Sequence, residues 1–337
     1  MLDFSRAELA LGIAGAICLL ALVCLGSIVR GWRLRRWARL TGATPPPAPI
    51  LLVWSRRCVL ALALLVLLCI PYSLLVEPNW LAVEQLAVSL PKIPQGTPPI
   101  RLVLISDTHC ERRPRLENGL PAVIKGLRPD LIVFAGDSLN ESRALPVFRR
   151  LMTELAAIAP TFVVRGNWDV WYFRDIDLFG GTGVTELTPQ LGVQRFAKNG
   201  IEIRLAGFAV LEGRPDRSAQ AHEPDIAGLL DDAPAQSVRV FVHHYSELAD
   251  IAVRHGADLV LAGDTHGGQA RLPFLGELVR LSRFGNYREA GLHRLGPSVL
   301  YITRGIGMEG GAAPRARFLC RPEVTLIEIG PETGSAR

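Results

Sequence analysis

Acidic and imidazole side chains follow short apolar runs at five places between residues 100 and 270. The five clusters are Ser106-Asp107-Thr108-His109, Gly136-Asp137, Arg165-Gly166-Asn167-Trp168-Asp169, His243-His244 and Gly263-Asp264-Thr265-His266-Gly267-Gly268. Ligands of α/β proteins gather beyond the carboxyl ends of strands, so we expect these side chains to meet at one edge of a sheet. Carboxylates mixed with neutral imidazoles are ligands for borderline divalent ions such as Mn, Fe, Zn or Co.

So many ligands exceed what one catalytic ion with an open coordination position takes, and two ions are therefore predicted. A pair of ions about 3.5–4 Å apart stabilises the attacking and leaving oxygens of a phosphoryl displacement and activates a bound water. The glycines beside the ligands let backbone and a tetrahedral phosphorus approach closely. The pattern predicts a two-metal hydrolase of phosphate esters or anhydrides.

Strands and helices must position these clusters. We expect strands over residues 100–105, 131–135, 161–164, 238–242, 259–261, 295–303 and 324–329, and helices over 116–127, 143–158 and 247–255. Asn199-Gly200 between the apolar runs 193–196 and 201–208 is typical of a β-hairpin. Strands that alternate with helices and are followed by hairpins predict an α/β sandwich, with sheets in the middle and helices outside.

Two apolar stretches precede this region. Residues 9–29 and 58–76 carry no charge, and at about 1.5 Å per residue each can cross a hydrocarbon core of about 30 Å. Asp3 and Glu8 before the first stretch argue against a cleaved signal peptide. The sequence therefore predicts two transmembrane helices, with one span plus a buried hairpin as the alternative.

The basic charge of the chain is local. Residues 30–57 hold seven arginines and no acid, so the formal charge of +5 becomes −2 for the remaining residues. This removes the main support for nucleic-acid binding. The positive-inside rule places the 30–57 loop in the cytoplasm and the rest of the chain outside it.

We therefore expect four segments. They are a membrane anchor over 1–76 with helices at about 9–29 and 58–76 and an Arg-rich loop at 30–57, a linker with an edge strand over 77–99, a catalytic domain over 100–330, and a tail over 331–337.

The ordered series DxH, GD, GNxD, H and GxTHGGQ resembles the calcineurin-like metallophosphoesterase family, and the segment from Arg304 to Gly307 is similar to its membrane-anchored bacterial branch. The resemblance covers about residues 100–330 and implies a dinuclear site in a four-layer α/β/β/α sandwich. The ligands that it implies are Asp107, His109 and His266 for one metal, Asp137 as the bridge, and Asn167, His243 and Asp264 for the second metal.

Two residues depart from the family pattern. Asp264 stands where the family has His, which favours Mn or Mg over Zn if the carboxylate is a ligand; the alternative is that Asp264 lies behind the ligands. Trp168 stands where the family has a His that protonates the leaving group, and an indole cannot transfer a proton. A phosphate leaving group needs no proton, so Trp168 favours a pyrophosphate bond. His222 or His244 is an alternative acid.

From these residues we expect a membrane-anchored phosphoesterase with two divalent metals, Mn first and Fe, Zn, Co or Mg as alternatives. We expect catalytic roles for Asp137, Asn167 and Asp169, and substrate contacts from Trp168 and Arg304. The expected substrate is a membrane lipid or a lipid-linked phosphate, and the expected location is the bacterial cytoplasmic (inner) membrane, with the catalytic domain outside the cytoplasm.

Two alternatives stay open. One is a UDP-2,3-diacylglucosamine pyrophosphatase of lipid A synthesis, which the chain also resembles and which would need a cytoplasmic catalytic domain. The other is a non-catalytic metal-binding membrane protein.

Overall fold

The chain folds into two compact units, Met1–Val76 and Glu77–Arg337. The structure is a computed structural model, and it describes residues 5–44, 47, 49–210, 219–274, 276–278, 289–309 and 315–332. Each unit is described by itself.

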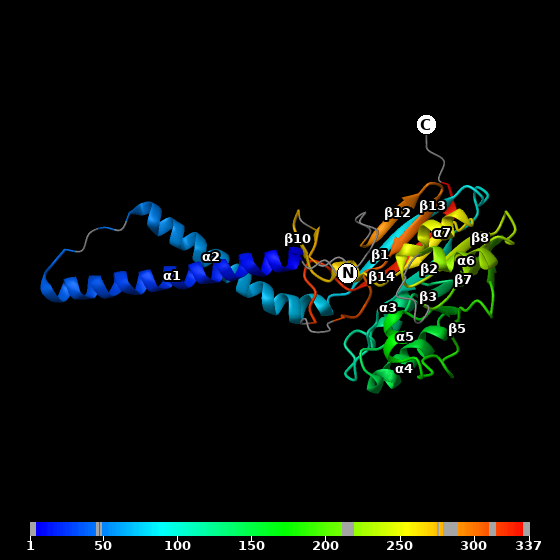
Figure 1. Ribbon diagram of the computed structural model, residues 1–337, viewed down its shortest axis with the longest axis horizontal. Helices are drawn as coiled ribbons and strands as arrows, with labels where there is room; N and C mark the ends of the chain where they lie inside the picture. The colour runs from blue at the N-terminus through cyan, green and yellow to red at the C-terminus, as the bar shows by residue number, and fades with distance from the viewer. Residues whose placement is uncertain are drawn as a thin grey trace. The chain divides into compact units, whose positions relative to one another are not determined.

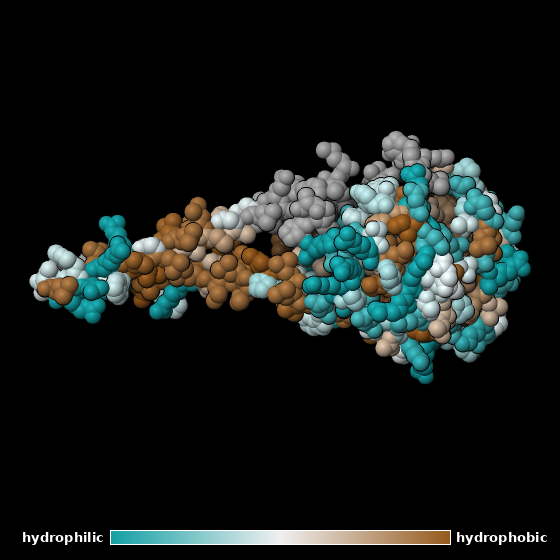
Figure 2. All heavy atoms as spheres, turned by 90° about the horizontal axis from the view of Figure 1, so that it is seen from below, coloured by the Kyte–Doolittle hydropathy of each residue, from teal (hydrophilic) through white to brown (hydrophobic). Residues whose placement is uncertain are grey.

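The first unit consists of the helices α1 (Ser5–Thr41) and α2 (Ile50–Pro71), and α2 continues into a π-helical turn, Tyr72–Val76. Both helices are long and apolar enough to cross a membrane, with mean hydropathies of 2.0 and 2.8 over their most apolar windows. Their outer surface is mostly hydrophobic, and hydrophilic side chains gather toward the connection between them (Figure 2). Residues 30–41 and 50–57, expected in a loop, are helical, so all seven arginines lie on α1 or α2.

The second unit contains two six-stranded sheets (Figure 1). The first has the order β1 (Ala82–Leu90), β14 (Glu323–Pro331), β2 (Ile100–Ile105), β3 (Leu131–Phe134), β4 (Thr161–Val163) and β5 (Thr185–Glu186). The second has the order β12 (Gly291–Leu295), β13 (Ser298–Ile302), β9 (Leu259–Ala262), β8 (Val238–Val242), β7 (Ile201–Gly207) and β6 (Gln194–Lys198).

Three apolar cores separate four layers. One core lies between the sheets and joins inward-facing residues such as Leu102 and Val133 of the first sheet to Val240 and Leu261 of the second. A second core packs α3 (Leu120–Gly126) and α4 (Leu145–Ala156) on the first sheet. A third packs α6 (Glu223–Leu230) and α7 (Ala249–Arg254) on the second. The order of layers is α/β/β/α, which confirms the predicted fold class.

Parallel pairing brings the ends of the central strands together. Ile105 pairs with Phe134, and Phe134 pairs with Val163, so β2, β3 and β4 end in line. In the second sheet, Val242 at the end of β8 pairs with Leu261 of β9. The loops that follow these strands are the ones that carry the polar clusters.

Several parts of the expected element list differ from the structure. The run 295–303 is not one strand, because Gly296 takes a left-handed conformation (φ 64°) and the chain turns between β12 and β13. The helices α5 (Asn167–Tyr172) and α6 and the strand β5 are not in the expected list, because segments of two to eight residues are too short for a clear apolar period.

Candidate metal centre

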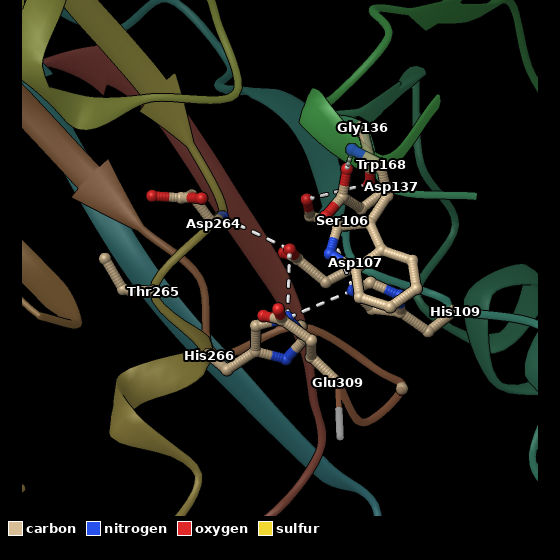
Figure 3. Close-up of polar contacts among 12 residues, drawn as sticks. Ser106, Asp107, His109, Gly136, Asp137, Trp168, Asp264, Thr265, His266 and Glu309 are labelled. Carbon is tan, nitrogen blue, oxygen red and sulfur yellow. Dashed lines mark hydrogen bonds and ion pairs between the residues drawn. The ribbon is translucent and has the colours of Figure 1, made fainter. Parts of the chain in front are cut away.

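The first group of converging side chains comes from the loops after β2 and β9. The Nε2 atoms of His109 and His266 lie 3.2 Å apart, and His266 Nε2 is 3.4 Å from Asp107 Oδ1 (Figure 3). One ligand atom from each of the three residues lies within 4.8 Å of the other two, and all three side chains are buried. These residues could hold one metal ion.

The second group shares Asp107 and adds the loops after β3 and β8. His244 Nε2 lies 3.4 Å from Asp137 Oδ2, 3.9 Å from Asp107 Oδ1 and 3.7 Å from Asp264 Oδ1. One ligand atom each of Asp107, Asp137 and His244 also lies within 4.8 Å of the other two. Asp137 also lies 3.4 Å from His109 Nε2, so its carboxylate stands between the two groups.

His244, and not the predicted His243, reaches this cluster. The amide of His243 still donates to Leu261 O (3.1 Å), so the extended backbone continues past β8 and successive side chains alternate between the two faces of the sheet. His243 therefore faces the outer core, where it stacks on Phe241 at an interplanar angle of 5°. His244 lies on the inner face with Val242, and its Nδ1–H donates to Ala135 O (2.7 Å).

The backbone at the cluster is strained. Five of the site residues have positive φ angles, a region that L-residues rarely adopt and that clusters at functional sites. They are Asp107 (51°), His109 (40°), Asp137 (60°), Asp264 (69°) and His266 (50°). Two glycines permit the close approach: a Cβ on Gly166 would lie 2.1 Å from Asp137 Oδ1, and one on Gly136 would lie 2.8 Å from His244 Nδ1.

The charges at the cluster are unbalanced without a cation. Burial raises the pKa of Asp107 to about 6 and holds the pKa of Asp264 well above its ordinary value. Burial works against the charged forms of Asp137 and His244 too, but their attraction for each other lowers the pKa of the carboxyl and raises that of the imidazole. Asp137 and His244 thus stabilise each other's charged form.

Several buried ligand atoms have no hydrogen-bond partner. At the cluster they are Asp107 Oδ2, Asn167 Oδ1 and His244 Nε2; His266 Nδ1, the ring nitrogen opposite the one that faces His109 and Asp107, and His243 Nε2 on the outer face also have none. A buried polar atom without a partner costs free energy, so an orphaned set of oxygens and imidazole nitrogens beside buried carboxylates needs an explanation. Divalent cations supply it, and the residues present fit them.

Asp169, expected among the catalytic residues, accepts hydrogen bonds from three backbone N–H groups instead. Its Oδ2 accepts the N–H groups of Asp137 (3.0 Å) and Gly166 (2.9 Å), and its Oδ1 accepts that of Ser138 (2.9 Å). Burial raises the pKa of this carboxyl to about 6. Asp169 is therefore a positioning residue that fixes the loops carrying Asp137 and Asn167.

Trp168 lies beside the cluster, as expected for a substrate contact. Its ring meets His109 edge-to-face at 5.1 Å and Tyr172 at 5.0 Å, and its amide donates to Asp137 Oδ1 (2.9 Å). Arg304 differs from the expectation: its guanidinium is paired with Glu84 and Glu323, both at 2.6 Å. Its charge is already compensated by these two carboxylates, so the structure gives it a structural role.

One supporting residue was missed. Asn140 Oδ1 lies 3.0 Å from His109 Nδ1, and the Asn140 amide donates to Met308 O (3.1 Å). Such a partner on the second ring nitrogen fixes the tautomer and orientation of a ligand histidine. Its position three residues after Asp137 carries no signal of its own in the sequence.

Comparison with known proteins identifies the class. The model of the calcineurin-like phosphoesterase family matches residues 100–268, and the chain belongs to this family. It is thus a metal-dependent phosphoric ester hydrolase, and proteins of the family bind two divalent metals.

Three relatives are similar over most of the chain. Phosphodiesterase YaeI of Escherichia coli is 29% identical over 75% of this chain and 90% of its own length. The uncharacterized metallophosphoesterase YkuE of Bacillus subtilis is 26% identical over 77% and 88%. A transmembrane protein with metallophosphoesterase domain from Danio rerio is 28% identical over 81% of this chain and 63% of its own length.

Proposed function

We propose that this chain is a membrane-anchored phosphoesterase that cleaves a phosphodiester or pyrophosphate bond in a lipid-linked substrate. The observation that carries the proposal is the convergence of buried ligand atoms from four strand ends in a chain that also has two helices long enough to span a membrane. The proposed ligands are Asp107, His109 and His266 for one metal, Asp137 between the two, and Asn167, His244 and Asp264 for the other.

The metal ions and the side chains around them would have different roles in the reaction. A bound metal pair would supply Lewis acidity toward the phosphoryl oxygens and a water acidic enough to attack at neutral pH. Two hydrogen bonds fix Asp137 between the ligand groups: its carboxylate accepts the backbone N–H of Trp168, and its own backbone N–H donates to Asp169. Because three of the proposed ligands are carboxylates, the set favours a hard ion, and we propose Mn before Zn.

Trp168 restricts the leaving group. It is the second residue of the helix α5 (Asn167–Tyr172), and its ring, which cannot donate a proton to a leaving group, lies against His109. Loss of a general acid costs about 10²–10⁴-fold only where the leaving oxygen needs a proton. A phosphate-type or acidic leaving group does not, so we propose bonds of that kind. This observation also favours the second candidate, a UDP-2,3-diacylglucosamine pyrophosphatase.

The side of the membrane separates the two candidates. Following the positive-inside rule for the arginines of α1 and α2, we propose that the connection between the helices lies in the cytoplasm and the catalytic unit outside it, in a bacterial inner membrane. A UDP-linked lipid is available only in the cytoplasm. A reporter active only outside the cytoplasm, fused after Arg337, and a second one active only inside decide between them.

Catalysis is tested on the full chain in detergent with bis-aryl phosphate and Mn. We expect turnover that stops on chelation and returns with metal, and its loss in Asp137→Asn. Asp225→Asn on α6 is the matched control and keeps full activity. Turnover that is unaffected by Asp137→Asn would overturn the assignment of the site.

A further inference from the structure

Exposed apolar side chains gather where the second unit begins. Trp80 is 52% exposed, Leu319 is 48% exposed, and Phe274 at the tip of the β10 (Arg271–Leu272) and β11 (Gly276–Glu277) hairpin is fully exposed. With the cations Arg271 and Arg321 we call these residues the junction patch.

Hydrogen bonds join the patch to the first residues of the unit. The buried carboxylate of Glu77 accepts the backbone N–H of Leu319 (2.7 Å) and that of Cys320. The Trp80 amide donates to Glu77 O (3.0 Å), and the guanidinium of Arg321 lies 4.2 Å from the centroid of the Trp80 ring. Trp80, Leu319 and Arg321 are therefore fixed around Glu77.

The hairpin with Phe274 extends from the same segment. The Arg271 amide donates to Phe318 O (2.8 Å), and the Phe318 amide donates to Gln269 O (2.9 Å). Leu319 follows Phe318 directly, so residues 318–320 are hydrogen-bonded both to the hairpin and to Glu77.

The covalent chain limits how far this patch can be from a membrane. The apolar helical segment ends at Val76, and Trp80 follows four residues later. Four residues span at most about 14 Å even when fully extended. If α2 crosses a bilayer, Trp80 lies within that distance of the end of the span, which is in or just beyond the headgroup region of about 5–8 Å.

The chemistry of the patch suits that depth. Tryptophan has an apolar body and one N–H group, and it is enriched where hydrocarbon meets water. The guanidinium of Arg321 beside it is attracted to anionic headgroups, whereas the charge of Arg271 is compensated by Glu277 at 3.6 Å. We propose that the junction patch rests in the headgroup region of a bilayer as a second attachment of the catalytic unit, an inference that rests on the proposed membrane anchoring.

This attachment would bring the metal centre close to lipid. The thiol of Cys320, next to Leu319, lies 3.2 Å from the carbonyl oxygen of His266, one of the proposed ligands. The segment that bears the patch thus packs directly against the loop that bears the ligand. The substrate class that fits is a phosphate ester or anhydride whose reactive group lies at the membrane surface.

The test uses the full chain with Cys18, Cys24, Cys58 and Cys69 replaced by Ala, so that the remaining native thiols, those of Cys110 and Cys320, are buried. Leu319→Cys, and separately Phe274→Cys, carries an environment-sensitive fluorophore. Leu191→Cys is the matched control, because Leu191 is 50% exposed and lies between β5 and β6, the strands at the other edges of the two sheets.

The variants are reconstituted into vesicles of phosphatidylcholine and phosphatidylglycerol, with and without lipids brominated near the headgroup. We expect a blue shift and bromine quenching for the probes at 319 and 274, and neither at 191. Protein that floats with the vesicles while the probes at 319 and 274 stay aqueous overturns the docking proposal and leaves the anchoring intact. Protein that does not float overturns the anchoring itself, and the docking with it.

Discussion

Two neighbouring histidines allow one substitution to be tested in two environments. His243 and His244 are both fully buried, but only His244 points its Nε2 atom toward Asp107, Asp137 and Asp264. We expect His244→Phe to remove one proposed metal ligand and His243→Phe to remove none. Phenylalanine keeps the ring in both variants and can coordinate nothing.

The magnitudes follow from the contacts. Loss of a partner that merely orients a ligand already weakens metal binding by about 10–100-fold, so loss of the ligand His244 is expected to cost at least about 100-fold. A matching loss of about 10²–10³-fold in kcat is expected if that metal stabilises the charge of the transition state. At position 243 the new ring packs between Phe208, 5.0 Å from the present ring, and Phe241. Phenylalanine cannot accept the backbone N–H of Tyr245, which His243 Nδ1 accepts at 3.0 Å, so we expect His243→Phe to cost about 1–3 kcal/mol of stability without loss of metal.

The assay is metal content by mass spectrometry after desalting, together with kcat on bis-aryl phosphate. Wild type and His243→Phe should carry two equivalents of metal, and His244→Phe one. If His243→Phe loses metal and activity while His244→Phe keeps both, the placement of these two rings is wrong. If both variants keep two equivalents, neither histidine is a ligand.

The remaining variants distinguish residues that affect the reaction from residues that affect only the stability of the fold. Trp168→His should speed the hydrolysis of diesters with poor leaving groups by up to about 10²–10⁴-fold and flatten the dependence of kcat on leaving-group pKa across an aryl series. Asp169→Asn should lower the free energy of unfolding by about 2–3 kcal/mol, because an amide cannot accept all three backbone N–H groups, and urea titration at pH 7 measures this. Burial lowers the pKa of His243 to about 3, so only the unfolded chain takes up this proton below pH 6.5. The stability contributed by this residue is complete above pH 6.5 and falls by about 1.4 kcal/mol per pH unit toward pH 3. Urea titrations should show that His243→Phe removes this contribution to the slope. Arg304→Gln should lower the thermal midpoint and leave KM unchanged, since both of its ion pairs are internal.

Most of the fold and of the cluster could be predicted from the sequence, because polar residues follow the apolar runs where the strands end. Apolar runs such as Ile100–Ile105 coincide with strands, and the polar residues that follow them meet because parallel strands end in line. The four layers follow from alternation of apolar runs and helices. The hairpin between β12 and β13 was hidden, because strand β12 is only partly buried along its length and lacks a continuous apolar run.

The sequence analysis chose His243 instead of His244 because it placed the end of the extended segment one residue too early. Counting the first residue after an apolar run assumes that the ladder stops with the run, but the amide of His243 still pairs with Leu261 O. In an extended segment the face changes at every residue, so one additional ladder position moves the ligand from 243 to 244. Val240 and Val242 lie in the inner core and Phe241 in the outer core, but this alternation is invisible in the sequence because all three residues are apolar.

The two departures from the family pattern act on the same chemical step. An Asp at 264 adds a third carboxylate near Asp107 and Asp137, and a more anionic ligand set holds a hard dication firmly while lowering its net charge. A weaker net charge gives less help to an unprotonated alkoxide that leaves the phosphorus. Trp168 at the same time supplies no proton to that oxygen. Both changes penalise poor leaving groups and spare those that are stable as anions, so we infer that they belong together in a site selected for an acidic leaving group.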